Sequence, residues 1–472
     1  MNVGRSSFKL FISRGGSSLV FFAGITLFAR WLNPESLGVF FTFLALAGVL
    51  SIPANAGIRG ALEKRLSEGE NPEAILGSAL VFKLGTLTVV CVVVLLFAPF
   101  INRFAGGDIA ALLVFYLVVK EFSMSYISTV RGELRVGETA SIQFGRRIVW
   151  ILVGGALVSA GYGASGMILG SICSRGFEFV WAFAKSDTRV GSPSHRALRS
   201  LFAFSKYDTI ISVGGRVYQW MDVLVIGFLL TQSDVGVYEM AWQVSLIVLV
   251  ASKSIELTIF PQISHWDANA SREQIEETVS TALRYTLFIS IPALAGSLFY
   301  AEDILRYLFG AEYAVAALVL IVLMVEKLFQ SVNDVVGSTV RALDRVDLSA
   351  YVTVTSIGVN LLLSPILVVT IGIVGAAIAT GVAWFVNVAL NARYLNQLIS
   401  FDIPYRFAGW YALASVLMSG VLAVATAVWP VTSAVGLIAH IGIGVVVYGV
   451  AVFVVPNVRN EVILPGVRTI LA

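Results

Sequence analysis

The chain has 472 residues, of which 57% are hydrophobic and only 13% are charged, and its mean hydropathy is +0.86. A water-soluble domain of this composition would expose far too much apolar surface, so the solvent of this protein is lipid. Its apolar blocks of about 18–25 residues have the length that an α-helix needs to cross about 30 Å of hydrocarbon. The net charge of +3 excludes little by itself. We therefore predict an all-α polytopic membrane protein.

About fourteen transmembrane helices are predicted in chain order. The first six cover residues 10–31, 37–58, 75–97, 109–130, 144–160 and 165–183. The next six cover residues 209–230, 235–260, 286–300, 313–332, 350–369 and 373–390, and two more cover 410–428 and 435–455. The first block contains Arg14 and Arg30 and lacks a cleavage site behind it, so we expect a retained helix and not a signal peptide.

The basic residues predict the orientation of these helices. With the N-terminus in the cytoplasm, the inside segments contain 22 of the 32 Lys and Arg residues, and the outside segments contain Arg30, Arg103 and Arg306. Loops rich in Lys and Arg remain on the cytoplasmic side of a membrane. We therefore predict that both termini and residues 185–206 are cytoplasmic.

An internal repeat is predicted from three pairs of similar segments. Residues 130–136 (VRGELRV) recur as 340–346 (VRALDRV), residues 163–166 (GASG) as 372–375 (GIVG), and residues 36–40 (SLGVF) as 234–238 (DVGVY). Their spacings of 210, 209 and 198 residues place an insertion near an expected inside loop over residues 261–284. The common order predicts a duplicated six-helix bundle, and transporters built in this way bind substrate between two halves that rock.

This duplication defines the expected domains. They are an N-terminal lobe of six helices over residues 1–184, a cytoplasmic linker over 185–206, a C-terminal lobe of six helices over 207–396, and the last two helices with a cytoplasmic tail over 397–472.

Two short motifs carry a resemblance to a known family. Residues 32–40 (LNPESLGVF) resemble the turn after the first helix of Wzx-type polysaccharide flippases, and residues 222–227 (DVLVIG) with 236–238 (GVY) are similar to their seventh helix. These flippases belong to the multidrug/oligosaccharidyl-lipid/polysaccharide (MOP) exporter superfamily, which has two six-helix lobes.

The resemblance implies a transporter of the cytoplasmic membrane, not an enzyme. Its implied cargo is a saccharide linked to polyprenyl or dolichyl phosphate, flipped by alternating access for surface polysaccharide or glycoprotein glycan assembly. Membrane lipid and a glycan polymerase or glycosyltransferases are the implied partners, and nucleic acid is not among them. We expect no cofactor or metal centre, apart from coupling to H⁺ or Na⁺, because the three His and two Cys residues are scattered.

Seven basic residues fall inside the predicted spans, where each would cost about 2.5–3.5 kcal/mol on a lipid-facing helix. They are Arg14, Lys83, Lys120, Arg175, Arg216, Lys253 and Lys327. The spacing of three residues favours self-neutralised pairs with no ligand role for Arg175 with Glu178 and for Lys253 with Glu256. The adjacent residues Glu326 and Lys327 are expected to point in different directions and to need other partners. Lys83 is expected to reach a cavity or an unidentified acid.

Arg14 and Arg216 are the strongest candidates for binding the lipid phosphate. Each flanks a glycine pair at the same place in the first and seventh predicted helices, although glycine pairs are also explained by helix packing alone. A guanidinium offers paired donors that match a phosphate. Asp222 could be their counter-ion or a proton or cation site. The predicted substrate-binding residues of a central cavity are Arg14, Arg216, Asp222, Lys83, Lys253 and Glu256.

The sequence disfavours two other functions and leaves a third one open. An enzyme of glycan assembly would need a substantial outer loop, but the longest one expected here covers residues 301–312 and has no His. An ATP-driven pump is disfavoured because the sequence contains no G-x-x-x-x-G-K-[ST] motif. An organic cation antiporter of the same superfamily stays open, since Asp222 and Glu239 could attract a cation.

Overall fold

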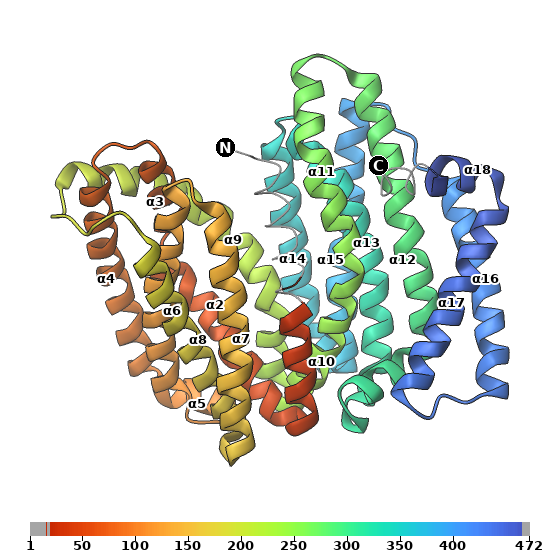
Figure 1. Cartoon of the computed structure of the whole chain (residues 1–472), viewed down its shortest axis with the longest axis horizontal. Coiled ribbons are helices and arrows are strands. Elements are labelled where there is room, and N and C mark those ends of the chain that lie inside the picture. The colour runs from red at the N-terminus through yellow and green to blue at the C-terminus, as the bar shows by residue number, and fades with distance from the viewer. Residues whose placement is uncertain (1–15, 17–18, 465–472) are drawn as a thin grey trace. The chain divides into compact units, whose positions relative to one another are not determined.

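The computed structural model describes residue 16 and residues 19–464, and for residues 206–217 it describes the helical backbone alone. The described part of the chain is helical and contains no strand. It forms two compact units, Met1–Gly236 and Val237–Ala472 (Figure 1). Eleven helices among the described residues are long and apolar enough to cross a membrane. The all-α membrane fold is therefore confirmed, whereas the number of fourteen helices and the predicted lobe boundaries stay predictions.

The first unit is built from long apolar helices and two short ones. It contains a helix over Leu19–Trp31, α2 (Pro34–Asn55), α3 (Ile58–Ser67), α4 (Pro72–Leu96), α5 (Ala98–Ala105), α6 (Ala110–Gly132), α7 (Val136–Leu157), the π-helical turn η1 (Val158–Tyr162), α8 (Gly163–Lys185), α9 (His195–Leu229) and the start of α10 (Gln232–Ser245). Helix α8 packs against α6 and α7, and α9 packs against α2, α3 and α4. The short helices α3 and α5 were not predicted, because neither is long enough to appear as a span.

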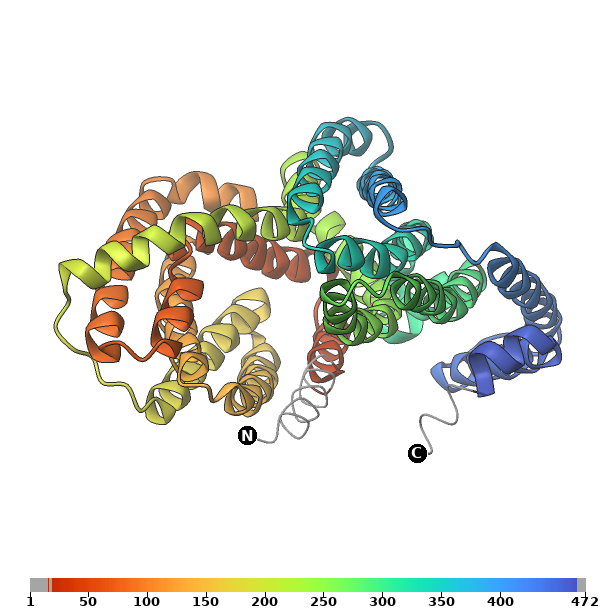
Figure 2. The same ribbon diagram turned by 90° about the horizontal axis from the view of Figure 1, so that it is seen from above.

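The second unit has the same construction and an additional pair of helices. After η2 (Leu246–Val248) come α11 (Leu249–Ala268), α12 (Arg272–Leu308), η3 (Ala311–Ala316), α13 (Ala317–Ala342), α14 (Val346–Ile371), α15 (Ile373–Leu398), α16 (Tyr405–Val428), α17 (Ala434–Val454), α18 (Pro456–Val458) and η4 (Arg459–Ile463). Helix α13 packs against α11, α12 and α15. The last pair, α16 and α17, packs against α12 at the edge of this unit (Figure 2).

The inside loop expected over residues 261–284 is wrong. Helix α11 continues to Ala268 with Pro261 inside it, and α12 already begins at Arg272. The polar residues of this stretch lower its hydropathy but do not interrupt the backbone hydrogen bonds of the helices. The two helices therefore extend beyond the apolar spans and form a long hairpin.

Two matching turns support the predicted repeat. Helices α6 and α13 both end in a Schellman motif, in which one residue adopts a left-handed conformation. That residue is Leu134 (φ 62°) after α6 and Asp344 (φ 57°) after α13. The closing bonds are Arg135 N to Val130 O and Arg345 N to Val340 O, both 3.2 Å long. A non-glycine residue with positive φ is uncommon, so its recurrence at equivalent places supports the duplication.

The second pair of segments repeats a backbone conformation that favours glycine. Gly163 before α8 has φ 53° and ψ −135°, and Gly372 before α15 has φ 65° and ψ −147°. Both glycines reverse the chain between two long helices. The structure therefore places the same turn at both sites.

The third pair of segments forms a close crossing between the starts of α2 and α10. A Cβ atom at Gly38 would lie 1.7 Å from the carbonyl oxygen of Gln232, and one at Gly236 would lie 2.0 Å from that of Pro34. Each glycine thus lies against the first residue of the other helix. All four residues belong to the first unit. No side chain larger than hydrogen fits at either glycine without a shift of the backbone.

The loop between α8 and α9 is fixed to the first unit by Glu133. The carboxylate of Glu133 accepts hydrogen bonds from the amides of Asp187 (3.0 Å) and Thr188 (2.9 Å) and from the hydroxyls of Thr188 (2.8 Å) and Ser186 (3.1 Å). Arg135 adds an ion pair of 2.7 Å with Asp187. The stretch predicted as a linker thus begins as a well-bonded loop.

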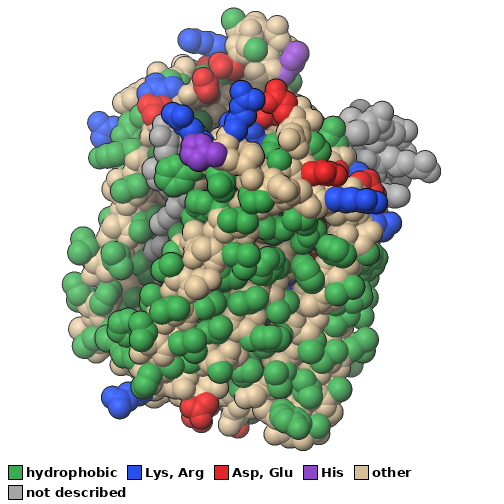
Figure 3. Space-filling view, turned by 90° about the vertical axis from the view of Figure 1, so that its left-hand side faces the viewer, with side chains coloured by type: hydrophobic (Ala, Val, Ile, Leu, Met, Phe, Trp, Pro, Cys, Tyr) green, Lys and Arg blue, Asp and Glu red, His purple; other side chains and the backbone are tan. Residues whose placement is uncertain are grey.

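Charged side chains of the first unit gather at one end. Figure 3 shows them mostly at the upper end, where α3 lies in Figure 1, above a broad band of hydrophobic side chains. We call this end the α3 end and the opposite one the α5 end. The apolar band between the ends has the character of a surface in contact with lipid.

Candidate substrate-binding site

Two predicted site residues cannot be placed. Arg14 lies outside the described residues, and Arg216 belongs to the part of α9 whose side chains the structure does not describe. Asp222, also on α9, is buried with 7% of its surface exposed. The proposed roles of these three residues stay predictions.

Lys83 is buried in an ion pair inside the first unit. Its Nζ atom donates hydrogen bonds to Glu121 Oε2 (2.8 Å) on α6 and to Asn55 Oδ1 (3.0 Å) at the end of α2. Both side chains of the pair are fully buried. The acid that could not be identified from the sequence is therefore Glu121, and this pair carries no net charge. The role of Lys83 in binding stays a prediction.

A second group of charges in the first unit has a positive excess. We call it the arginine cluster: Arg146 and Arg147 on α7, with Arg175 and Glu178 on α8. Arg175 Nη1 lies 2.6 Å from Glu178 Oε2, and Arg146 Nε lies 3.2 Å from Glu178 Oε1. The same carboxylate accepts a hydrogen bond of 2.7 Å from the Ser123 hydroxyl.

One carboxylate therefore binds two guanidinium groups. Glu178 is 1% exposed, and its two oxygens are occupied by Arg175, Arg146 and Ser123. The Arg147 guanidinium lies 4.2 Å from the centre of the Phe21 ring and makes no hydrogen bond within the described residues. Three cations and one anion leave a net charge of +2. The predicted pair of Arg175 and Glu178 forms, but it is not self-neutralised, because Glu178 also pairs with Arg146 within a cationic group.

The depth of the cluster suits a transported group. Arg146 comes ten residues after the start of α7 at Val136, a distance of about 15 Å along the helix. Arg146 and Arg147 therefore lie at the middle of a 22-residue helix, whose length matches that of a hydrocarbon core about 30 Å thick. Such charges inside a membrane normally face a cavity, a partner or a ligand.

The sequence interpretation missed the cluster because it placed the start of α7 too late. The helix was predicted from residue 144, which put Arg146 and Arg147 at the membrane surface, but it begins at Val136. Its first turns are polar and do not resemble a span. The repeat could have indicated the earlier start, because a helix begins directly after the matching turn in both copies, at Val136 in the first and at Val346 in the second.

The charges on α11 and α13 form a balanced group in the second unit. Lys253 Nζ lies 2.9 Å from Glu256 Oε2 and 2.6 Å from Asp334 Oδ1, and Arg341 Nη2 lies 2.8 Å from Glu256 Oε1. The predicted pair of Lys253 and Glu256 therefore forms within a larger network of two cations and two anions. Whether Lys253 and Glu256 bind cargo stays a prediction.

The prediction that Glu326 and Lys327 point in different directions is wrong, whereas the expected need for other partners agrees with the hydrogen bond of 3.2 Å from Lys327 to Gln330 Oε1. Lys327 Nζ lies 2.7 Å from Glu326 Oε2, so the adjacent residues pair with each other. The ammonium group also lies 3.5 Å from the Trp242 ring centre. A flexible lysine chain can turn back to a neighbouring acid when both side chains are excluded from water, as these fully buried ones are.

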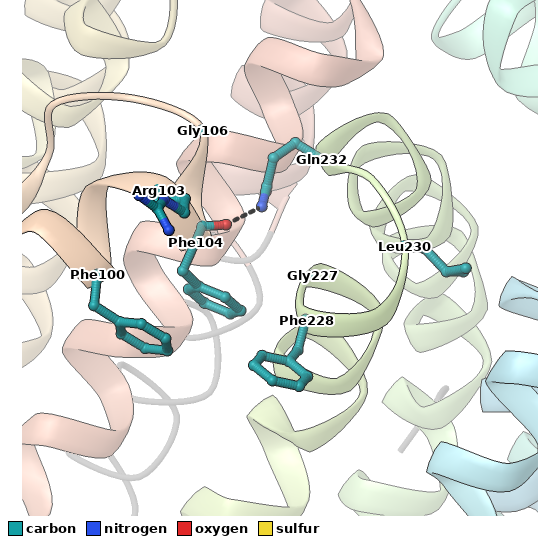
Figure 4. A pocket seen from close by; sticks show the side chains of 8 residues that line it. All are labelled: Phe100, Arg103, Phe104, Gly106, Gly227, Phe228, Leu230 and Gln232. Atoms are coloured by element: carbon teal, nitrogen blue, oxygen red, sulfur yellow. Dashed lines mark hydrogen bonds between the residues drawn. The ribbon is translucent and has the colours of Figure 1, made fainter.

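A pocket of about 350 Å³ opens at the α5 end of the first unit (Figure 4). It is lined by Phe100, Arg103, Phe104, Gly106, Gly227, Phe228, Leu230 and Gln232. The Gln232 amide donates a hydrogen bond of 2.8 Å to the carbonyl oxygen of Phe104 and accepts one of 2.6 Å from the Thr42 hydroxyl. This pocket was not predicted, because its walls come from segments about 125 residues apart in a chain of mostly apolar residues.

Comparison with known proteins identifies the family. A family model described as "Polysaccharide biosynthesis protein" matches residues 27–318. The protein "Probable low-salt glycan biosynthesis flippase Agl15" of Haloferax volcanii is 40% identical over 448 residues, which cover 95% of each chain. The chain belongs to the polysaccharide biosynthesis protein family. A model of "Lipid II flippase MurJ" also matches residues 228–444, and "Probable flippase AglR" of the same organism is 27% identical over 89% of this chain and 88% of its own.

Solved structures agree with this family assignment at the level of the fold. A lipid II flippase MurJ in an inward closed conformation aligns with a TM-score of 0.82 at 17% identity, over 96% of this chain and 99% of that one. A multidrug resistance MATE family transporter of the MOP superfamily aligns with a TM-score of 0.60 at 16% identity, over 81% and 95%. The predicted resemblance to flippases of the MOP superfamily is confirmed.

Within this polysaccharide biosynthesis family member, the arginine cluster is the group best suited to bind an anion. The network around Lys253 is neutral and Lys83 is held in a fully buried ion pair, whereas the cluster has a net positive charge on partly exposed side chains. Its guanidinium groups are only partly exposed, at 15% for Arg146 and 14% for Arg175. Partial exposure leaves donors within reach of a ligand and reduces screening by water.

Proposed function

We propose that this chain is a flippase that moves a saccharide linked to polyprenyl or dolichyl phosphate across the cytoplasmic membrane by alternating access. Membership of the polysaccharide biosynthesis family supports this proposal, as does the 40% identity to a protein described as a glycan biosynthesis flippase. The duplicated units support it further, because transporters with parallel repeats work by rocking one half against the other.

The arginine cluster is the observation that carries the proposal. A lipid phosphate would bring negative charge to a place where the guanidinium groups of Arg146 and Arg175 share the Glu178 carboxylate and that of Arg147 lies over the Phe21 ring. Hydrogen bonds from guanidinium to phosphate are charge-assisted and often paired, so they combine strength with orientation. An organic cation would be repelled by the same excess, which disfavours the antiporter alternative.

The proposed orientation places the α3 end and both termini in the cytoplasm. The reason is the concentration of Lys and Arg in the predicted inside segments. The glycan would then be assembled on the lipid at the α3 end and delivered at the α5 end. Glycosyltransferases or a glycan polymerase would act before and after this step, while the chain itself would carry out no catalysis.

A transport assay on arginine variants tests the proposal. Replacement of Arg146 or Arg147 by Ala removes charge-assisted hydrogen bonds, each worth about 1.5–3 kcal/mol, which should lower cargo affinity roughly 10- to 150-fold. Replacement by Lys should restore transport in part, since lysine keeps the positive charge but lacks the paired N–H donors of the guanidinium group. Arg65→Ala is the matched control, because Arg65 pairs with Glu68 (2.8 Å) at the α3 end. The measurement is flipping of lipid-linked saccharide in vesicles with equal amounts of inserted protein.

Normal flipping by the Arg146→Ala/Arg147→Ala double variant would contradict the cluster's role. The same assay on Arg14→Ala and Arg216→Ala would then decide whether those arginines bind the phosphate instead. Export of an organic cation by the wild-type chain, without flipping of lipid-linked saccharide, would favour the antiporter alternative.

A further inference from the structure

Three buried asparagines form a polar cluster inside the second unit, next to the ion pair of Lys253 and Asp334 but, within the described residues, with no hydrogen bond to it. We call it the asparagine triad: Asn333 on α13, with Asn387 and Asn391 one turn apart on α15. Their exposed fractions are 9%, 9% and 2%. All three lie within helices that are apolar enough to span the membrane. Asparagine is expensive to bury in such a place unless its amide is fully hydrogen-bonded.

The hydrogen bonds of the triad fix the direction of each amide. Asn391 Nδ2 donates to Asn333 Oδ1 and to Asn387 Oδ1, both at 2.9 Å. Both hydrogens of this nitrogen are therefore used. Because their oxygens face Asn391, the amide nitrogens of Asn333 and Asn387 point away from it.

The triad is not satisfied by these bonds alone. The Oδ1 atom of Asn391 is buried and accepts no hydrogen bond in the described part of the chain. The amide nitrogens of Asn333 and Asn387 also donate to no described residue. The Asn333 amide lies directly against Gly337, where a Cβ atom would come 3.0 Å from Asn333 Oδ1, so a larger side chain at this glycine would press on the triad. The triad thus presents one unpaired buried acceptor and two open donors, and only a partner that can both donate and accept satisfies both kinds of group.

This combination selects the chemistry of the ligand. A phosphate has no hydrogen for the Asn391 acceptor, and the triad contains no cation to attract it. A metal cation would meet two amide nitrogens whose hydrogens repel it. A hydroxyl group both donates and accepts, and saccharides present several of them. The neighbouring acid, Asp334, is already occupied by Lys253 (2.6 Å) and the Ser252 hydroxyl (2.7 Å).

We propose that the asparagine triad binds hydroxyl groups of the saccharide and so recognises the glycan, while the arginine cluster binds the lipid phosphate. This inference rests on the proposed function, because it assumes a lipid-linked saccharide as cargo. It assigns the two parts of the cargo to two chemically different groups of residues. A glycan without a hydroxyl in the matching position would leave the Asn391 acceptor buried and unpaired, which disfavours its binding.

Native mass spectrometry of the purified full chain can test the proposal with two probes, dolichyl phosphate and dolichyl phosphate glucose. The wild-type chain should bind the glucosylated lipid about tenfold more tightly, as expected for two or three added neutral hydrogen bonds. Asn387→Ala and Asn391→Leu should abolish this difference and leave binding of dolichyl phosphate unchanged. Ser338→Ala is the matched control, since Ser338 is also buried on α13 but bonds only within its helix, to Val335 O (2.9 Å).

Each outcome decides between the roles. Equal binding of the two lipids by the wild-type chain would overturn the triad's role and leave the proposed function standing. An equal loss of both lipids in the triad variants would show that the asparagines only hold α13 and α15 together. If the wild-type chain bound neither lipid, the proposed function itself would fail, and the triad's role with it.

Discussion

The buried pair of Lys83 and Glu121 allows a stringent test of the structure. Lys83→Met leaves the Glu121 carboxylate in a site where neither side chain is exposed, and Glu121→Gln leaves the ammonium there. At 2.8 Å and an effective dielectric constant of about 20, the direct attraction is about 6 kcal/mol. Much of this offsets the cost of removing both charges from water, so loss of one partner should cost about 3–5 kcal/mol.

The measurement is a double-mutant cycle on the free energy of unfolding, obtained by denaturant titration in mixed micelles. The Lys83→Met/Glu121→Gln double variant removes both charges of the pair and should recover most of the stability lost in either single variant. Flipping by the double variant then separates two roles of Lys83. If Lys83 has only a structural role, the double variant should recover both stability and transport. If Lys83 binds cargo, the double variant should recover stability but not transport. A single variant whose free energy of unfolding lies within about 1 kcal/mol of the wild-type value would contradict the buried ion pair.

The other predictions concern packing, the α8–α9 loop and orientation. Gly38→Ala should lower the free energy of unfolding by about 1–3 kcal/mol, because the added Cβ would overlap a backbone carbonyl. The control Gly85→Ala places its Cβ in open space and should have little effect. Equal effects of the two variants would contradict the close crossing of α2 and α10. Glu133→Gln should weaken the hydrogen bonds that hold the α8–α9 loop and so speed its limited proteolysis, whereas the exposed control Glu70→Gln should not. Equal cleavage rates of the two variants would contradict the role of Glu133 in holding the loop. Ser192→Cys, with both native cysteines replaced, should react with an impermeant thiol reagent only in inside-out vesicles, and labelling of intact cells would reverse the proposed orientation.

The helices that cross the membrane could be predicted well, because a span must be long and apolar. The expected helix over residues 75–97 corresponds to α4 (Pro72–Leu96), and that over 435–455 to α17 (Ala434–Val454). Helix α3 could not be found in this way, since its ten residues mix charged and apolar side chains. Hydropathy reports contact with lipid, and α3 instead packs against α4, α6 and α9.

Site residues could be predicted only where the partners are close in sequence. The pair of Lys253 and Glu256 follows from a spacing of three residues on one helix. The partner of Lys83 could not be predicted, since Glu121 is 38 residues away and the contact depends on how α4 packs against α6. The asparagine triad joins two helices in the same way. Neutral polar residues inside apolar segments give no sequence signal comparable to that of a charge.

The arginines of α7 also have a consequence for the assembly of the protein during its synthesis. Two adjacent arginines near the middle of a span raise the free energy of insertion by about 5–7 kcal/mol on insertion scales, and a few apolar residues do not offset this cost. Helix α7 is therefore a poor substrate for the translocon when it emerges from the ribosome alone. Helix α8 follows after only the short turn η1 and brings Glu178, which pairs with Arg146. The two helices should accordingly enter the membrane together as a hairpin, so a nascent chain arrested between them would leave α7 outside the bilayer.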